Sequence, residues 1–328
     1  MTGTEEKLIL AADIGGTRAR FILGHARAGA CDVLRREVLP CAAHSGIEAL
    51  IEAFLGAGQE AEKPSVACLA VAGALEGQRI HMTNLPWEAD AECLRARFGF
   101  SRVRLLNDFA AQAYGLGNLD ADGIAVLHSG KPDAQGVRAL IGPGTGLGMA
   151  ILAGSLGDPH VFPSQGGLAD FAPRNARELA LCEALLAAHG RVSLETLLSG
   201  RGIERLDRFV SGLPPDALSA RDAAAIGAAA LAGEPVAAEA LRFFARLLAA
   251  AAANLGLTVL AHGGIYLTGG IVPRILPFLR EPEFVGAFLE HPSMGKVLAR
   301  IPLYAVRDEL LGLKGAARIA AKLARDEN

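Results

Sequence analysis

Two glycine-rich turns, each lying between two apolar segments of strand length, constrain the fold of this chain more than any other feature. The first turn, Asp13-Ile14-Gly15-Gly16-Thr17, follows the apolar residues 7–12 and precedes residues 20–23. The second turn, Gly142-Pro143-Gly144-Thr145-Gly146, lies between residues 137–141 and 149–153. Short apolar runs bounded by glycine indicate strands joined by tight turns. The chain is therefore predicted to contain two β-hairpins of the same plan, one in each of two similar halves.

The residues of these turns are also suited to binding an anion. Glycine lets backbone N–H groups approach a phosphate without a side chain between them, and the threonines of the two turns add hydroxyl donors. Asp13 would repel a phosphate, so its functional interpretation is to hold the water shell of a magnesium ion. A third glycine pair, Gly269-Gly270, follows the strand-like residues 265–268. Ordinary structural turns are the alternative interpretation of each segment, and neither the Walker A nor the Rossmann pattern is matched.

Helix-like and strand-like patterns alternate over the first half of the chain, which predicts an α/β fold. Residues 65–74 and 102–106 are predicted to be buried strands, with an amphipathic helix at 91–98 between them. Asn175, with a glutamate three residues later, predicts a capping box at the start of a helix that ends at Gly190.

The second half is dominated by one long apolar stretch, residues 237–260. Charged residues such as Glu239 and Arg242 interrupt this stretch, which favours a buried helix over a membrane span. Pro273 is predicted to begin the helix that follows the strand 265–268, because proline suits the first helical position. A basic amphipathic helix is predicted after Gly312.

Length and composition narrow the class of protein. A chain of 328 residues exceeds what one hydrophobic core usually serves and suggests two domains. The 32 basic and 35 acidic residues leave a formal charge of -3, which argues against a nucleic-acid surface. The five cysteines are scattered without a C-x-x-C pattern, so neither disulfides nor a zinc site is indicated. With no export signal recognised and no membrane association expected, the predicted location is cytoplasmic.

A set of motifs along nearly the whole chain resembles those of bacterial glucokinases, in the hexokinase, Hsp70 and actin superfamily. The motifs are Asp13-Ile14-Gly15-Gly16-Thr17 with Ala19-Arg20, Met82-Thr83-Asn84-Leu85-Pro86-Trp87, Leu106-Asn107-Asp108-Phe109, Gly142-Pro143-Gly144-Thr145-Gly146-Leu147-Gly148, Asp170-Phe171-Ala172-Pro173, Leu197-Leu198-Ser199-Gly200 and Gly269-Gly270-Ile271-Val272-Pro273-Arg274. The sequence lacks the zinc-binding cysteine cluster of the repressor/ORF/kinase (ROK) sugar kinases, so the resemblance is to the non-ROK glucokinase group.

The resemblance implies a fold and an activity. The fold would be an α/β, two-domain actin-like ATPase (ribonuclease H-like) fold with an interdomain cleft. Residues 1–110 plus 311–328 would form the small domain, and residues 111–310 the large domain. The activity would be ATP-dependent, Mg²⁺-dependent phosphorylation of the 6-hydroxyl of glucose or a related hexose, and the family suggests a homodimer. The residues implied in ATP binding are Asp13, Gly15, Gly16, Thr17, Gly144, Thr145, Gly146, Gly269 and Gly270, with Asp13 holding Mg²⁺ through water.

Asp108 has two interpretations on the residues alone. It is either the N-cap of a helix over 109–114 or a carboxylate that accepts the proton of a sugar hydroxyl. The resemblance implies the second role, that of the catalytic base. It also implies that Asn107, Asp108 and Glu195 bind the sugar, although Glu195 also suits the first turn of a helix capped by Ser193.

The sugar side of the predicted site departs from the family pattern. The usual E-G-G-H segment is replaced here by Gln165-Gly166-Gly167-Leu168. Gln165 keeps an acceptor and stays a predicted sugar ligand, whereas Leu168 can neither donate nor accept a hydrogen bond. A buried sugar hydroxyl left unpaired there would cost about 1–3 kcal/mol. The alternatives are therefore a kinase for a different hexose or sugar derivative and a catalytically weakened sugar or nucleotide sensor.

A second departure lies in the first glycine turn, where Arg18 occupies a position at which the family has asparagine. The guanidinium group would either add positive charge beside the phosphates or point into solvent. Both interpretations are open at this stage.

Overall fold

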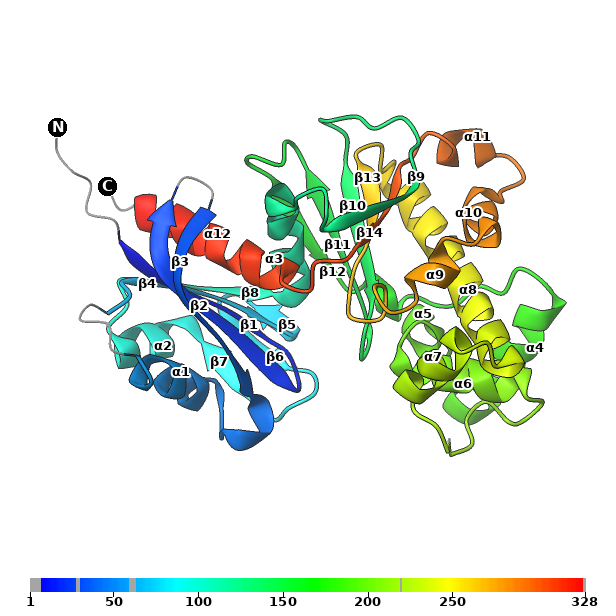
Figure 1. Ribbon diagram of the computed structural model, residues 1–328, viewed down its shortest axis with the longest axis horizontal. Helices are drawn as coiled ribbons and strands as arrows, with labels where there is room; N and C mark the ends of the chain where they lie inside the picture. Colours follow the sequence, from blue (N-terminus) through cyan, green and yellow to red (C-terminus); the bar gives the residue numbers. More distant parts are fainter. Residues whose placement is uncertain (1–6, 28–29, 59–62, 219, 327–328) are drawn as a thin grey trace. The chain divides into compact units, whose positions relative to one another are not determined.

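Internal contacts divide the chain into two units, which are drawn in the computed structural model of Figure 1. Unit 1 comprises Met1–Leu119, Leu156–Val161 and Leu310–Asn328, and unit 2 comprises Asp120–Ser155 and Phe162–Glu309. The structure describes residues 7–27, 30–58, 63–218 and 220–326. Unit 1 includes the helix at 108–115, which packs closely on the C-terminal helix of the same unit.

The main sheet of unit 1 is a hairpin extended by parallel strands. Its strands are β1 (Leu8–Ile14), β2 (Arg18–Arg27), β3 (Ala30–Pro40), β4 (Val66–Val71) and β8 (Arg102–Asn107). They lie in the order β3-β2-β1-β4-β8, with β1, β2 and β3 antiparallel and β1, β4 and β8 parallel. A smaller sheet has the order β5-β6-β7 and consists of β5 (Gly73–Glu76), β6 (Arg79–Met82) and β7 (Glu88–Asp90). The carboxyl ends of β1, β4 and β8 therefore meet at one edge of the main sheet.

Helices cover both faces of this main sheet, as Figure 1 shows for α1 and α2 on one face and α3 and α12 on the other. The helices of unit 1 are η1 (Cys41–Ala43), α1 (Ile47–Gly56), α2 (Ala91–Phe98), α3 (Asp108–Gly115), η2 (Leu116–Asn118) and α12 (Leu311–Arg325). Along β1, Leu8 and Leu10 belong to the core that contains α1, whereas Ile9 and Ala11 belong to the core that contains α12. This alternation follows from the two-residue period of a strand and explains why residues 8–12 of β1 are all apolar.

Unit 2 repeats the plan of a hairpin followed by parallel strands. Its strands are β9 (Ile124–His128), β10 (Arg138–Pro143), β11 (Leu147–Ala153), β12 (His160–Ser164), β13 (Gly264–Leu267) and β14 (Leu303–Val306). The order is β12-β11-β10-β13-β14-β9, in which β10 and β11 are antiparallel and β10, β13 and β14 are parallel. Since β1-β2 with β4 and β8 has the same arrangement, the prediction of two similar halves is confirmed.

The long helix α8 forms the centre of the helical part of unit 2. The helices of this unit are η3 (Gly166–Leu168), α4 (Ala176–His189), α5 (Leu194–Leu197), α6 (Gly200–Val210), α7 (Ala223–Leu231), α8 (Pro235–Val259), α9 (Leu276–Leu279), α10 (Pro282–Leu289) and α11 (Gly295–Leu298). α8 contacts α6, α7 and α10 and buries Phe243 and Phe244 in the core, so the prediction of a buried helix is confirmed. Among the described residues, no helix combines the length and apolar character needed to cross a membrane.

Helix ends are partly as predicted. The Asn175 side chain accepts a hydrogen bond from the Glu178 N–H at 3.0 Å, and Gly190 ends α4 with a φ of 70°. The Glu178 carboxylate, however, accepts from the N–H of Arg174, so the reciprocal half of the predicted capping box is absent from this pair. The basic helix predicted after Gly312 is α12, which begins one residue earlier.

Two predictions of secondary structure are wrong. Residues 65–74 form two strands, β4 and β5, because the chain leaves the main sheet after Val71 and Gly73 pairs closely with Met82 of β6. Pro273 begins no helix: it lies in turns, and α9 starts at Leu276 with Pro277 in its first turn. Proline suits a turn as well as a helix start, and the sequence pattern does not separate the two.

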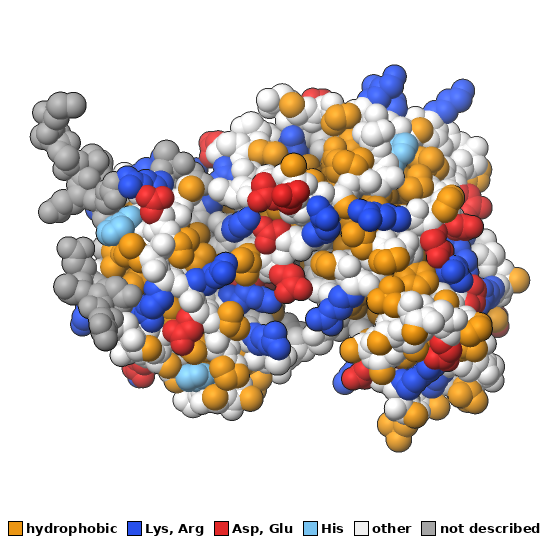
Figure 2. Space-filling model, viewed as in Figure 1, with side chains coloured by type: hydrophobic (Ala, Val, Ile, Leu, Met, Phe, Trp, Pro, Cys, Tyr) orange, Lys and Arg blue, Asp and Glu red, His pale blue; other side chains and the backbone are white. Residues whose placement is uncertain are grey.

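Charged side chains of both signs lie close to one another on the surface. On the face drawn in Figure 2, basic and acidic side chains are intermingled among apolar ones. Many of them form ion pairs, for example Arg97 with Glu52 in unit 1 and Arg242 with Glu281 in unit 2. Basic and acidic residues, which are nearly equal in number, therefore often lie next to one another on the surface.

Candidate functional site

The first glycine turn joins β1 to β2 and is held by backbone hydrogen bonds. The Gly15 N–H donates to the Arg18 carbonyl at 3.0 Å, and the Cys41 N–H donates to the Thr17 carbonyl at 2.9 Å. A side chain at Gly16 would place its Cβ 3.1 Å from the Cβ of Asn84, so the segment after β6 packs directly on the turn. A side chain at Gly16 would therefore be tight against Asn84, and the hydrogen bonds give the turn a defined shape.

Asp13 lies at the end of β1, beside this turn. Its carboxylate is 3.8 Å from the guanidinium group of Arg20, which is its partner across the hairpin. The first turn of α12 also approaches it, since a methyl group at Gly312 would lie 3.1 Å from Asp13 Oδ2. Burial raises the pKa of Asp13 to about 6, and the positive charge of Arg20 only partly opposes this rise.

Asn107 and Asp108 lie at the same edge of the sheet as Asp13. The register aligns Ile14 with Val71 and Val71 with Asn107, so β1, β4 and β8 end at the same level. The Asn107 side chain accepts hydrogen bonds from the first N–H groups of α3, at 3.0 and 3.3 Å. Asn107, rather than Asp108, is therefore the N-cap of α3, and the alternative interpretation of Asp108 as the cap is wrong.

Asp108 is left as the first residue of α3, and it is only partly exposed to solvent. Burial, and then the negative charge of Asp13, raise the pKa of Asp108 to about 7, while backbone N–H groups at the start of α3 oppose the rise. Asn107 Nδ2 donates one hydrogen bond to the Gly73 carbonyl at 3.1 Å. The Asn107 amide also hydrogen-bonds to the Asp108 carboxylate and lowers its pKa, so it links the end of β8 to the proposed base.

The carboxylates of unit 1 fit a magnesium ion that is carried by a substrate. The negative charge of Asp13 raises the pKa of Asp108, and a divalent cation beside Asp13 would offset that charge. Among the described residues, no group of three or more His, Cys, Asp or Glu side chains could hold a metal by itself. Mg²⁺ commonly binds through one or two carboxylates together with waters and substrate phosphates, and this donor set matches that pattern.

The second glycine turn, in unit 2, is held at both of its ends. The Gly200 N–H donates to the Gly144 carbonyl at 2.9 Å, and the Leu147 N–H donates to Glu195 Oε2 at 2.9 Å. A methyl group on Gly146 would overlap the Glu195 carboxylate. Thr145 lies at the exposed tip between these attachments. The turn thus presents its tip outward from a fixed base.

Gly269 and Gly270 lie beside this second turn. Gly269 has a φ of 84°, and a Cβ there would lie 2.5 Å from the Pro143 carbonyl oxygen, so only glycine fits. At Gly144 and at Gly270, in contrast, an added Cβ would meet no heavy atom of the described chain within 4 Å. The structure therefore brings together the two glycine segments of unit 2 that the sequence predicts to bind ATP, and both have an open side.

The predicted sugar-binding segments of unit 2 also converge on this turn. η3 follows Gln165 and packs on the start of β11, where a methyl group on Gly167 would overlap the Leu147 carbonyl. The Leu194 N–H of α5 donates to the Ala169 carbonyl at 2.9 Å. Gln165 is exposed and Leu168 is half exposed, so both side chains are available to a ligand.

Several close contacts of these segments could not be recognised from the sequence. Gly312 lies against Asp13, Gly200 holds Gly144, and the Cys41 thiol donates to the Gly15 carbonyl at 3.3 Å. Ser199 and Gly200 belong to the motif Leu197-Leu198-Ser199-Gly200. The sequence does not reveal that they begin α6 or that this end of α6 contacts the second glycine turn. Arg18 begins β2 with an exposed side chain.

Comparisons with known proteins point to one family. The family model described as Glucokinase matches residues 10–323. A glucokinase of Chromohalobacter salexigens is 37% identical over 307 residues, which cover 94% of this chain and 95% of that protein. A glucokinase of Saccharophagus degradans is 36% identical over 314 residues, which cover 94% and 96% respectively. The crystal structure of a glucokinase from an Antarctic psychrotroph matches with a TM-score of 0.83 at 34% identity, covering 96% of this chain and 99% of that one.

Proposed function

Because this chain belongs to the glucokinase family and has its two-domain actin-like ATPase fold, we propose that it transfers the γ-phosphoryl group of ATP to the 6-hydroxyl of glucose. The observation that carries this function is the buried Asp108 at the start of α3, whose pKa is raised to about 7 beside Asp13. A carboxylate with a pKa near the working pH is a stronger base than an ordinary aspartate and is still ionised in part. The residues proposed for this function come from both units.

Asp108 is the proposed base. Its ionised carboxylate accepts the proton of the 6-hydroxyl as that oxygen forms its bond to the γ-phosphorus, and the bond to the departing ADP breaks. Asn107 caps α3 and so fixes the backbone from which the Asp108 side chain projects. Asn107 is also a proposed sugar ligand, as the family resemblance implies.

The two glycine turns are proposed to bind ATP. The proposed donors are backbone N–H and hydroxyl groups of Gly16 and Thr17 in unit 1 and of Thr145 and Gly146 in unit 2. The N–H groups of Gly15 and Gly144 are used within the turns, and these two residues are proposed to leave room for the phosphates. Gly269 and Gly270 are proposed to let the backbone approach the adenosine part. Asp13 would hold Mg²⁺ through water, and when bound the ion supplies positive charge against the phosphate oxygens.

Two of the proposed sugar ligands suit glucose, whereas the apolar side chain of Leu168 suits a less polar sugar. Glu195 and Gln165 are proposed sugar ligands, because both offer acceptor oxygens near the second turn. Leu168 offers none, so a sugar with a less polar group at that place would lose less binding energy than glucose. A kinase for such a hexose derivative is the second candidate function.

The test is ADP release by the purified protein with a panel of hexoses, glucose among them, and a control without sugar. Glucose is expected to give the highest kcat/KM. Asp108→Asn is expected to lower turnover by about two to four orders of magnitude while nucleotide binding persists. Asp122→Asn, at an exposed position of unit 2, is the matched control and should keep full turnover.

Other outcomes would contradict the proposal in different ways. Turnover of another hexose derivative alone would replace glucose by the second candidate. Nucleotide binding without turnover of any sugar would indicate a sensor. Near-normal turnover of Asp108→Asn would remove Asp108 as the base. The proposed place of action is the cytoplasm, and the five cysteines of the chain, all free thiols, suit it.

A further inference from the structure

Glu195 is implied as a sugar ligand by family resemblance, yet one of its carboxylate oxygens is already in use. Glu195 Oε2 accepts the Leu147 N–H at 2.9 Å, and the same oxygen lies where a methyl group on Gly146 would be. The carboxylate is thus packed against the backbone of the second glycine turn at its β11 end. We propose that Glu195 is a positioning residue for this turn, so that it prepares the ATP side of the reaction before any sugar is present.

A second hydrogen bond to the turn comes from the connection between α5 and α6, residues 197–200, which we call the α5–α6 corner. The Gly200 N–H, at the start of α6, donates to the Gly144 carbonyl at 2.9 Å. Within the turn, the Gly144 N–H donates to the Gly146 carbonyl at 2.8 Å. The N–H groups of Gly144 and Leu147 are therefore engaged by protein, and the tip between them is the part available to a phosphate. The corner between α5 and α6 decides where that tip points.

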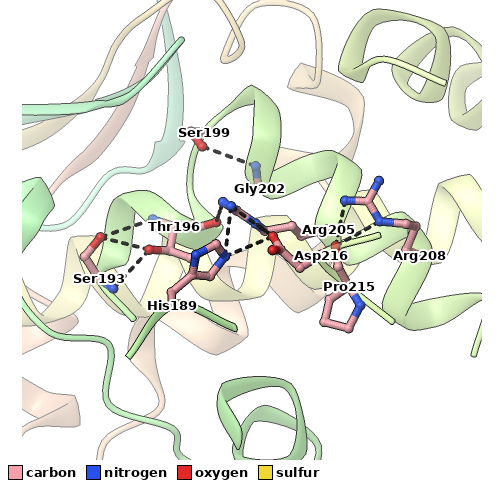
Figure 3. Close-up of polar contacts among 9 residues, drawn as sticks. All are labelled: His189, Ser193, Thr196, Ser199, Gly202, Arg205, Arg208, Pro215 and Asp216. Atoms are coloured by element: carbon pink, nitrogen blue, oxygen red, sulfur yellow. Dashed lines mark hydrogen bonds and ion pairs between the residues drawn. The ribbon is translucent and has the colours of Figure 1, made fainter. Parts of the chain in front are cut away.

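A network of polar contacts anchors this corner, as Figure 3 shows. Arg205 donates from Nη1 to the Thr196 carbonyl, next to Glu195, at 3.0 Å. Its guanidinium group also pairs with Asp216 at 3.2 Å, and Asp216 contacts His189 at 2.9 Å. Ser193 and Thr196 complete a capping box at the start of α5. With α5 held on both sides, the Glu195 carboxylate has little freedom to leave Leu147.

Charge explains why the role is positioning rather than phosphate binding. A carboxylate repels a phosphate, but by accepting the Leu147 N–H it orients the neighbouring peptide without meeting the ligand. The other oxygen, Oε1, remains available to a sugar hydroxyl. If the proposed function holds, sugar bound at Oε1 and nucleotide bound at the turn are linked through one side chain.

The experiment measures binding of adenylyl imidodiphosphate with Mg²⁺, by calorimetry, in the absence of sugar. Glu195→Ala is expected to weaken this binding about tenfold, because it removes a charge-assisted hydrogen bond that orders the turn. Glu195→Gln retains an acceptor for the Leu147 N–H and should stay within about threefold of wild type. Asp122→Asn, at an exposed position of the same unit and outside the proposed sites, is the control and should not change sugar-free nucleotide affinity.

Gly146→Ala is the independent variant, because its methyl group would push the carboxylate away from the turn. It should weaken sugar-free nucleotide binding as Glu195→Ala does, and thermal melting of each variant would show that it is folded. Unchanged affinity in a folded Glu195→Ala protein would overturn the proposal. Loss of nucleotide affinity in a protein that phosphorylates no hexose would leave this proposal standing and overturn the proposed function instead.

Discussion

Asp13 and Asp108 show how two ordinary aspartates acquire unusual properties from their place at one sheet edge. Both are partly buried, which raises the pKa of each, and the negative charge of Asp13 adds to the pKa rise of Asp108. Arg20 opposes the rise only at Asp13. The two carboxylates therefore titrate as an interacting pair, and the proposed base is the member with the higher pKa.

This arrangement predicts the pH dependence of turnover and its electrostatic cause. Because the base must be ionised, kcat/KM should fall as the pH is lowered through about 7, the value to which burial and Asp13 raise the pKa of Asp108. Asp13→Asn removes a neighbouring negative charge and should lower the pKa of Asp108. Carboxyl-carbon NMR titration of Asp108 in both proteins measures this directly. An identical midpoint in Asp13→Asn would leave burial as the sole cause.

At the scale of elements, α12 brings residues from the end of the chain to the start of the sheet. Its close packing on α3 depends on Gly315, where a methyl group would overlap the Ala111 carbonyl. The same approach places Gly312, in the first turn of α12, against the Asp13 carboxylate. A helix that contributes no predicted ligand thereby limits where the Asp13 side chain can lie.

Replacement of Gly312 by alanine should separate activity from stability. The new methyl group would lie 3.1 Å from Asp13 Oδ2, a tight contact that should displace the carboxylate by a few tenths of an ångström. Turnover should fall about tenfold, with the KM for Mg-ATP raised, because Asp13 is the proposed magnesium residue. Stability should hold or rise, since alanine favours a helix over glycine by up to about 1 kcal/mol.

The control for this prediction is Gly286→Ala in α10, where an added methyl group meets nothing within 4 Å in the described structure. It should keep full turnover. If Gly312→Ala also keeps full turnover and an unchanged KM for Mg-ATP, then the contact with Asp13 has no part in positioning it.

At the scale of the whole molecule, the raised pKa values reduce stability at neutral pH. In the folded chain Asp13 and Asp108 hold protons up to about pH 6 and 7, whereas in the unfolded chain they release them near the ordinary value of 3.8. The folded state therefore binds more protons between about pH 4 and 7. Its free energy of unfolding should fall as the pH rises through this window.

Asp108→Asn should consequently be inactive but more stable at pH 8. Removing a buried charge should raise the free energy of unfolding there by about 1–3 kcal/mol, with a smaller difference at pH 4.5, where the wild-type carboxyl is protonated in the folded state. Calorimetric melting at the two pH values checks this. Asp122→Asn, at an exposed position, is the control. Equal destabilisation of Asp108→Asn at both values would refute the linkage.

The local features of the fold were predictable from the chain itself. The two hairpins, the helices at 91–98 and 176–189 and the buried α8 follow from apolar period, glycine and capping residues, which act within a few positions. The failures at Pro273 and at residues 65–74 also have a local origin. Proline suits both turns and helix starts, and an apolar run does not reveal where it leaves a sheet.

What the sequence by itself determined is the family, the two glycine turns and the chemical types of the proposed ligands. Tertiary structure decided which of them act together: Asn107 rather than Asp108 caps α3, Glu195 accepts the Leu147 N–H, and Gly312 limits where the Asp13 side chain can lie. The physical reason is the distance along the chain over which each property is determined. Backbone conformation responds to neighbouring residues, whereas pKa values and close contacts depend on burial and on partners that only folding brings near.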